Sequence, residues 1–147
     1  MSVEILKMSR EHLSDVANIE KACFSAPWSE KALELLLAEN NFAIVAVADG
    51  KAVAYAGFCG VLDEGEITNV ATLPEYRRQH IAIELMKCLL GTANANGIKR
   101  ITLEVRVSNI SAQSLYRQCG FTECGLRKNF YQMPREDAII FEYKFKD

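Results

Sequence analysis

Residues 67–107 read ITNVATLPEYRRQHIAIELMKCLLGTANANGIKRITLEVRV, and this stretch decides the fold. Ile67 to Leu73 is predicted to be a strand, which Pro74 ends, and a polar loop follows from Glu75 to His80. An amphipathic helix is expected next, stopped by Gly97, with this apolar face: Ile81, Leu85, Met86, Leu89 and Leu90. Ile101 to Val107 is the following strand. Such a strand–loop–helix–strand unit is long enough for a parallel crossover, and ligands gather at the loops of such units.

The loop of this unit has the features of a phosphate site. Free backbone N–H groups at the start of a helix and the helix dipole both direct positive charge at a ligand. Arg77 and Arg78 add cationic side chains in the same loop. The pattern alone fits an anion site and a solvated connector equally well.

The segments before this unit alternate between helical and strand patterns. Residues 3 to 8 look like a strand, and Ser9 and Ser29 are candidate N-caps of two successive helices separated by Pro27. Phe42 to Ala48 and Ala52 to Leu62 are strand-like, joined by the hairpin turn Asp49-Gly50. A further turn is expected at Asp63 to Gly65.

After the unit, a short helix and two strands complete the chain. Ser108 and Asn109 can cap a helix that ends at Gly120, and strands are expected over Phe121 to Arg127 and Ala138 to Phe145. The predicted order is β-α-α-β-β-β-α-β-α-β-β. This is an α/β fold with a mixed sheet flanked by helices, in a single domain over residues 1–147.

Composition excludes several classes of protein. The two histidines are too few for a His-rich metal site, so no metal is expected, and the net charge of −2 gives no global attraction to nucleic acid. The five cysteines form no C-x-x-C pair and are expected to be buried thiols. No apolar run approaches the length of a membrane span, and the first residues lack a signal-peptide pattern. A cytoplasmic protein without membrane or nucleic-acid partners is expected.

The segment Val70-Ala71-Thr72 followed by Arg77-Arg78-Gln79-His80-Ile81-Ala82 resembles the cofactor segment of the GNAT acetyltransferase superfamily, Q/R-x-x-G-x-G/A. The resemblance implies a GNAT fold with acetyl-CoA as the co-substrate. It also implies contacts from Val70, Ala71 and Thr72 to the pantetheine arm. The diphosphate would be held by the backbone amides of these residues: Arg78, Gln79, His80, Ile81, Ala82 and Ile83.

His80 departs from the family pattern, which has glycine at that position. Glycine there allows positive φ and a close approach of the backbone to phosphate. Histidine is among the side chains that tolerate positive φ, so the turn is expected to persist. The side chain either points to solvent or lies beside a phosphate.

Nearly the whole chain resembles the RimI group of this superfamily, which acetylates the N-terminal alanine of a small-subunit ribosomal protein. The specific segments are Pro27-Trp28-Ser29-Glu30, Leu103 to Asn109, Leu115-Tyr116 and Arg135-Glu136-Asp137-Ala138. The resemblance implies that the acceptor is the α-amino group of a protein N-terminus, most specifically a ribosomal protein.

The resemblance also implies two catalytic residues. Glu104 matches the general base, acting directly or through a water, although its residue pattern also fits an ion pair with Arg106 on a solvated face. Tyr116 matches the acid that protonates the leaving thiolate, although a helix tyrosine is more often a packing residue.

The remaining site residues follow from the same resemblance. Asn109 would contact the cofactor's amide arm and cap its helix. Trp28 would lie beside the acceptor groove, with Tyr131, Arg135 and Glu136 facing it from the last hairpin. Arg135 and Glu136 fit a surface ion pair equally well.

Two other functions stay open at this point. One is a GNAT enzyme that acetylates a lysine side chain or a small amine, since the cofactor half of the fold is shared among many acceptors. The other is a non-catalytic acyl-CoA sensor, suggested by His80 in the phosphate loop.

Overall fold

The structure is a computed structural model that describes residues 2–146, so Met1 and Asp147 of the expected domain lie outside the described residues. The order of helices and strands is the predicted one. In chain order, the elements are β1 Glu4–Lys7, α1 Leu13–Cys23, α2 Glu30–Leu33, β2 Asn41–Ala48, β3 Lys51–Val61, β4 Glu64–Thr72, α3 Ile81–Ala95, β5 Arg100–Arg106, α4 Ile110–Gln118, β6 Thr122–Gln132 and β7 Arg135–Lys144. Short 3-10 helices cover Arg10–His12, Glu34–Leu37 and Pro74–Tyr76. The predicted α/β class is confirmed.

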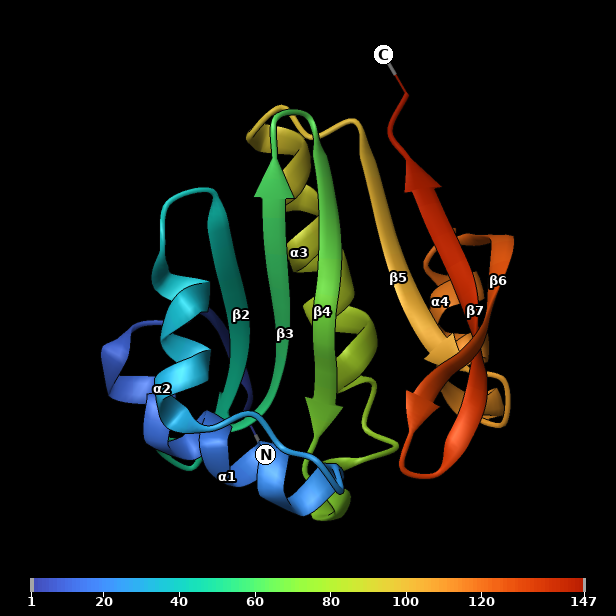
Figure 1. Ribbon diagram of the computed structural model, residues 1–147. Helices are drawn as coiled ribbons and strands as arrows, with labels where there is room; N and C mark the ends of the chain where they lie inside the picture. Colours follow the sequence, from blue (N-terminus) through green and yellow to red (C-terminus); the bar gives the residue numbers. More distant parts are fainter. Residues whose placement is uncertain (1, 147) are drawn as a thin grey trace.

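The strands form one mixed sheet, in which the seven strands have the order β1-β2-β3-β4-β5-β7-β6. The pair β4 and β5 is parallel, as the crossover requires, and the other neighbouring pairs are antiparallel. Strands β4 and β5 pair only from Glu64↔Arg100 to Glu66↔Thr102 and then diverge, which is visible in the lower half of Figure 1. The sheet is therefore open between the carboxyl ends of these two strands, where open α/β sheets bind their ligands.

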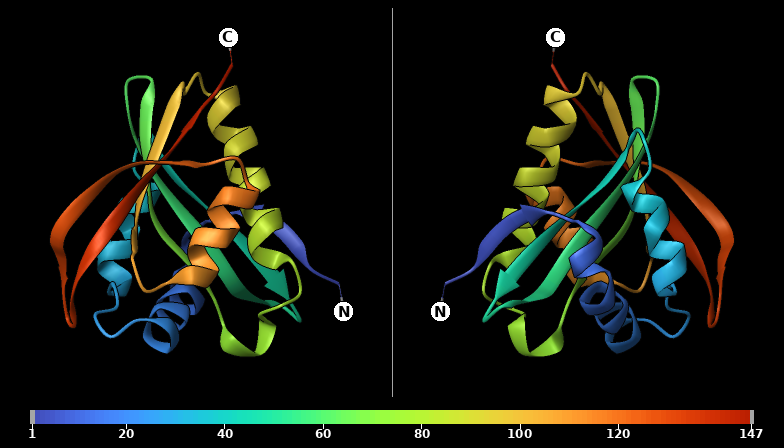
Figure 2. Two further views of the ribbon diagram at one scale, coloured as in Figure 1. Left: turned by 90° about the vertical axis from the view of Figure 1, so that its right-hand side faces the viewer. Right: turned by 90° about the vertical axis from the view of Figure 1, so that its left-hand side faces the viewer.

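Helices cover both faces of the sheet (Figure 2). Helices α1 and α2 pack on one face over a core that includes Ile19, Leu33 and Val45. Helices α3 and α4 pack on the other face, over a core that includes Leu85, Ile101 and Phe141. Full burial of such a side chain contributes about 1.5–3 kcal/mol, so both layers stabilise the fold.

Local signals explain several of the observed boundaries. Asp49 and Gly50 both have positive φ, 53° and 80°, as a tight turn between antiparallel strands requires. The Ser29 hydroxyl accepts a hydrogen bond from the Ala32 N–H at 3.1 Å and caps α2 as predicted. Gly97, with φ 81°, follows the C-cap residue Asn96 and makes the left-handed turn that ends α3.

The predicted boundaries are wrong in two places. The turn before β4 lies at Leu62 and Asp63, because Glu64 and Gly65 already pair with β3. The final hairpin is longer than predicted at its tip, where Tyr131 pairs with Glu136 and β6 runs to Gln132. In both places polar residues extend a strand because backbone pairing needs no apolar side chain.

The cysteines also differ from the prediction. Four of them are half-buried, and Cys124 is exposed because it lies on β6, the outermost strand of the sheet. Within residues 2–146, no helix is both long enough and apolar enough to cross a membrane.

Candidate active site

Two clefts open where β4 and β5 diverge. The first cleft, of about 610 Å³, lies between the end of β4, the loop that leads into α3, and α4. The second cleft, of about 640 Å³, lies between β4, β5, the segment linking α1 to α2, and the β6–β7 turn. The two clefts share six of their lining residues: Cys23, Phe24, Val70, Asn109, Ala112 and Tyr116. Molecules bound in the two clefts would therefore meet at these residues.

The predicted cofactor residues gather around the first cleft. Its lining includes Val70, Ala71, Thr72, Arg78, His80, Ile81, Ala82, Ile83 and Asn109. Gln79 does not line the first cleft, so this one predicted residue lies outside it. The strand end, the helix start and α4 thus bring together residues that are far apart in the sequence.

The loop that leads into α3 has a strained backbone at two positions. Arg78 has φ 64°, and His80 has φ 60° and ψ 17°, so both adopt the left-handed conformation. His80 is the N-cap of α3, and its carbonyl accepts the first helical hydrogen bond, from the Glu84 N–H at 3.2 Å. The N–H groups of Ile81, Ala82 and Ile83 have no partner within the helix and can bind an anion in the first cleft.

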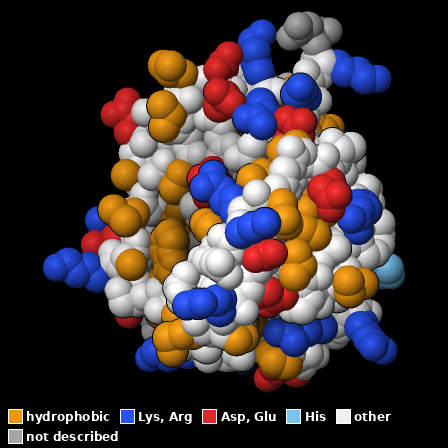
Figure 3. Space-filling view, turned by 45° about the vertical axis from the view of Figure 1, so that its right-hand side comes forward, with side chains coloured by type: hydrophobic (Ala, Val, Ile, Leu, Met, Phe, Trp, Pro, Cys, Tyr) orange, Lys and Arg blue, Asp and Glu red, His pale blue; other side chains and the backbone are white. Residues whose placement is uncertain are grey.

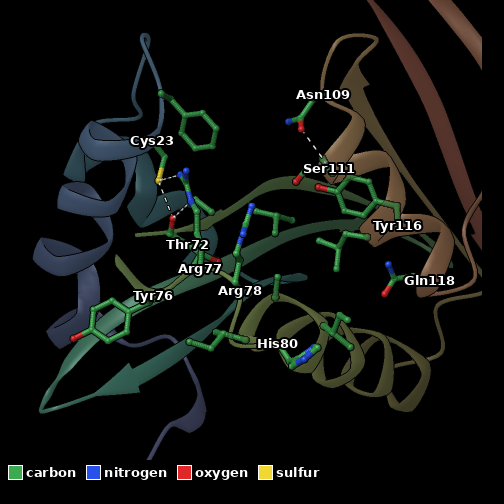
Figure 4. A pocket seen from close by; sticks show the side chains of 18 residues that line it. Cys23, Thr72, Tyr76, Arg77, Arg78, His80, Asn109, Ser111, Tyr116 and Gln118 are labelled. Atoms are coloured by element: carbon green, nitrogen blue, oxygen red, sulfur yellow. Dashed lines mark hydrogen bonds between the residues drawn. The ribbon is translucent and has the colours of Figure 1, made fainter. Parts of the chain in front are cut away.

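The two arginines of the loop differ in their surroundings. Arg77 donates from Nε to the Thr72 carbonyl at 3.0 Å and lies 3.5 Å from the Cys23 sulfur through Nη2. Figure 4 shows this contact with Cys23 and Thr72 on the α1 side, while Arg78 projects between it and α4. Arg77 therefore ties the loop to β4, and Arg78 is the cation available to a ligand.

Asn109 caps α4 and still has hydrogen-bonding capacity. Its Oδ1 accepts from the Ala112 N–H at 3.1 Å, as predicted for a cap. Because the oxygen is used by the cap, the Nδ2 group remains as a donor, and Figure 4 shows this side chain at the rim of the cleft.

Tyr116 lies at the junction of the two clefts with only 7% of its surface exposed. Its ring centroid is 6.0 Å from that of Phe121 and 6.2 Å from that of Phe141. Burial among these rings raises the pKa of Tyr116 well above its usual value. The phenol is therefore protonated at neutral pH.

Glu104 lines the second cleft from β5, and its side chain is 14% exposed. Burial is the main reason why the pKa of Glu104 is raised, and the nearby Glu66 carboxylate raises it further, while Arg127 opposes the shift. The expected ion pair with Arg106 is wrong, because Glu104 Oε1 lies 3.5 Å from Arg127 Nε instead.

Arg106 pairs with the last hairpin. Its Nη1 lies 3.2 Å from Glu136 Oε1 and donates to the Pro134 carbonyl at 2.9 Å, and its guanidinium lies 4.2 Å above the Tyr131 ring. Glu136 Oε2 also accepts from the Ser108 N–H at 2.6 Å. These contacts fix the hairpin against the start of α4.

The predicted acceptor residues divide into two groups. Trp28 and Tyr131 line the second cleft, whereas Arg135 and Glu136 are not among its lining residues, and their place at the acceptor groove stays a prediction. Glu136 forms its ion pair with Arg106 and accepts a hydrogen bond from the Ser108 N–H. The alternative of an Arg135–Glu136 ion pair is therefore wrong. The hydrogen bond from Ser108, with that from Arg106, lowers the pKa of Glu136.

The walls of the second cleft approach each other at one point. The Ser25 hydroxyl donates to the Met133 carbonyl at 3.3 Å, linking the α1–α2 segment to the β6–β7 turn. In the space-filling view, hydrophobic side chains gather in a hollow, with charged side chains of both signs around it (Figure 3).

A buried carboxylate in this wall was missed in the sequence. Glu20 is 1% exposed and accepts hydrogen bonds from the Trp28 N–H at 2.8 Å, the Tyr55 hydroxyl at 2.5 Å and Asn69 Nδ2 at 3.1 Å. Its position could have been found, because Glu20 follows Leu13, Val16 and Ala17 on the apolar face of α1 by helical spacing. Within residues 2–146 no group of three or more acidic, His or Cys side chains could hold a metal, and the expected absence of a metal stays a prediction.

Comparison with known proteins identifies a family match. Residues 13–121 match the family described as "Acetyltransferase (GNAT) family". A protein of Escherichia coli (strain K12), named [Ribosomal protein bS18]-alanine N-acetyltransferase, is 37% identical over 125 residues, which is 84% of this chain and 84% of that protein.

Solved structures agree in fold. The crystal structure of the ribosomal-protein-S18-alanine N-acetyltransferase from Escherichia coli superimposes with a TM-score of 0.92 at 32% identity, covering 99% of this chain and 96% of that one. A chain of the NatC complex bound to Gag peptide and CoA has a TM-score of 0.87 at 18% identity, over 99% of this chain and 100% of that one, and shows the same fold.

Proposed function

This chain belongs to the acetyltransferase (GNAT) family and is an N-acetyltransferase, and from that premise we propose that its acceptor is the N-terminal alanine of ribosomal protein bS18. The reaction transfers the acetyl group of acetyl-CoA to the α-amino group of that alanine. The two relatives described above carry this acceptor in their names, and they cover most of the chain.

The observation that carries the proposal is the meeting of two clefts at Tyr116 and Asn109. A transfer between two substrates requires that the reacting atoms be held together, and a shared junction of two clefts provides that geometry. The contact between Ser25 and Met133 links the two walls of the second cleft. A cleft bridged in this way favours a chain terminus as the acceptor over an internal lysine, which has polypeptide on both sides.

The first cleft suits acetyl-CoA. The N–H groups that open α3 and the Arg78 guanidinium are suited to the diphosphate, and the Asn109 Nδ2 donor is suited to an amide of the pantetheine arm. Acetyl-CoA, when bound, supplies a thioester whose acetyl group is activated for attack by an amine.

Glu104 is assigned the role of base. An α-amino group is largely protonated at neutral pH and must lose a proton before it can attack. Glu104 lies in the second cleft, and its raised pKa brings it nearer to the range in which a base is effective. It accepts the proton directly or through a water.

Tyr116 is assigned the role of acid. Its hydroxyl belongs to a side chain that reaches both clefts, and its raised pKa keeps the phenol protonated. The proton held at Oη stabilises the leaving sulfur as the thioester bond breaks.

The cellular compartment of the enzyme follows from the proposed acceptor. A ribosomal protein is made and assembled in the cytoplasm, which is the compartment we assign to the enzyme. Partners other than the ribosomal protein, whether nucleic acid or membrane, have no part in the proposal.

The test is thiol release from acetyl-CoA with a short peptide that begins with the alanine terminus of bS18. The matched control is the same peptide with its α-amino group blocked and an internal lysine retained. Release only with the free terminus supports the proposal. Release with both peptides assigns the enzyme to lysine acceptors. CoA binding without release from either peptide overturns the proposed acceptor and points first to another amine and then to a non-catalytic acyl-CoA sensor.

A further inference from the structure

The carboxamide of Asn69 has only one of its two ends bonded. Nδ2 donates to Glu20 Oε2 at 3.1 Å, while Oδ1 is buried and has no hydrogen-bond partner among residues 2–146. A buried carbonyl oxygen without a partner costs free energy, so such an atom calls for an explanation. Asn69 lines the second cleft, beside the residues assigned to the acceptor.

Glu20 determines which end of this carboxamide is available. Three donors converge on the Glu20 carboxylate, and an ionised carboxylate can only accept hydrogen bonds. The Asn69 amide must therefore direct its NH₂ group toward Glu20. The oxygen is left on the other side of the carboxamide.

The local backbone supports a special role for this position. The pairing of β3 with β4 shifts register between Gly57 and Phe58, so that Gly57 pairs with Asn69, Phe58 pairs with Ile67, and Thr68 is the extra residue of a bulge. Thr68 Oγ1 is also buried without a partner, and Thr68 lines the second cleft as well. The bulge thus places two successive residues, each with an unpaired buried polar atom, in the lining of the cleft.

We propose that Glu20 is a positioning residue that orients Asn69 so that Oδ1 accepts a hydrogen bond from an N–H group of the acceptor's first residues. This inference rests on the proposed function, because it assigns the N–H donor to the protein N-terminus that the enzyme acetylates. The donor is the α-amine or the first peptide N–H. Both are N–H groups that can donate a hydrogen bond to an unpaired carbonyl oxygen.

The decisive variant is Glu20→Gln. A glutamine keeps the size of the side chain and places an NH₂ group opposite Asn69, which must then flip and accept through Oδ1. The Tyr55 hydroxyl can donate or accept, so its contact persists. The network stays bonded, but the atom of Asn69 directed away from residue 20 changes from an acceptor to a donor.

The measurement compares the KM for the alanine peptide with the KM for acetyl-CoA. Glu20→Gln is expected to raise the KM for the alanine peptide by at least about fivefold and to leave the KM for acetyl-CoA within about twofold. The matched control is Tyr55→Phe, which removes one hydrogen bond from Glu20 without changing the orientation of Asn69. It is expected to lower the melting temperature and to leave both KM values within about twofold.

A second variant covers the case in which Glu20→Gln does not fold. Asn69→Ala removes the oxygen and is expected to raise the peptide KM in the same way. An alanine peptide N-methylated at its first peptide bond separates the two donors. If that N–H is the partner, methylation raises the wild-type KM and Asn69→Ala adds nothing further; if the α-amine is the partner, the variant's effect is the same with both peptides.

The outcomes are distinguishable. If the wild type does not acetylate the free-terminus peptide, the proposed function fails and this inference fails with it. If the wild type does so and Asn69→Ala leaves the peptide KM unchanged, the proposed function stands and the role of Asn69 is overturned. If Tyr55→Phe raised the peptide KM as much as Glu20→Gln does, the role of Asn69 would also be overturned, because the network would then act only through stability.

Discussion

Glu104 Oε1 lies 3.5 Å from Nε of Arg127, which reaches it from β6 across the intervening strand β7. The carboxylate is 14% exposed and the guanidinium-bearing side chain is 57% exposed, so the pair lies at the border between the cleft and solvent. Glu66 raises the pKa of Glu104 from the other side. The basicity of Glu104 is thus set by burial and by charges on two other strands, Glu66 on the adjacent strand β4 and Arg127 on β6.

Arg127→Gln tests this relationship. Loss of the cation raises the pKa of Glu104 further, so the acidic limb of the pH profile of kcat moves to higher pH, by less than about one unit because the pair is partly screened. The control is Arg10→Gln, which removes an exposed cation from a 3.6 Å pair with Glu34 and should leave the limb in place. A shift to lower pH would contradict the assignment.

Glu104→Gln removes the assigned base. We expect kcat to fall by about 10²–10⁴-fold and the KM for acetyl-CoA to change little, because Glu104 lines only the second cleft. Steady-state kinetics with the alanine peptide measures both. The control Glu123→Gln removes an exposed carboxylate of β6 and should retain activity. Retained activity in Glu104→Gln would assign the base elsewhere.

Tyr116→Phe removes only a hydroxyl. We expect turnover to fall by roughly one to three powers of ten with little change in the dissociation constant of acetyl-CoA, as befits a lost proton donor. The rings of Phe121 and Phe141 pack against the ring and not the hydroxyl, so the melting temperature should change little. Unchanged turnover would remove Tyr116 from the mechanism.

His80→Gly relieves a left-handed residue at the start of α3. Glycine has no steric cost at φ 60°, but it gains entropy in the unfolded state, so we expect the free energy of unfolding to stay within about 1 kcal/mol. Acetyl-CoA should bind modestly more tightly, as measured by titration calorimetry. Weaker binding would show that the imidazole contacts the ligand. His80→Val is the opposite control and should destabilise the protein, because β-branched residues avoid this conformation.

Glu136→Gln tests the contacts of Glu136 with Arg106 and Ser108, which hold the β6–β7 hairpin against the start of α4. The pKa of Glu136 is lowered in the folded state by Ser108 and Arg106, so its contribution to stability is present above the unfolded-state pKa and is lost as the pH falls through the folded-state pKa. Melting temperatures of the variant should therefore depend less steeply on pH in the acidic range than those of the wild type. Equal slopes would mean that the ionised carboxylate contributes nothing there.

The element order was accessible from the sequence because its signals are local. Asp49-Gly50 predicted a turn that both residues make with positive φ, and Ser29 and Asn109 predicted caps whose side-chain oxygens accept the expected backbone hydrogen bonds. The alternation of Glu104 with apolar neighbours predicted the half-buried face of β5. The extra length of the final hairpin was not accessible, since its tip is polar and is held by pairing with a partner strand.

The sequence by itself determined the fold class, and its resemblance to the GNAT cofactor segment predicted most of the residues that line the first cleft. That resemblance rests mainly on one continuous segment, in which the loop carries its own backbone N–H groups to the start of the helix. Only the tertiary structure decided which charges pair. Glu104 meets Arg127, Arg106 meets Glu136, and Glu20 meets Asn69, each across 23 to 49 positions of chain. Such pairings depend on the register of strands and the packing of helices on a sheet, which no single segment encodes.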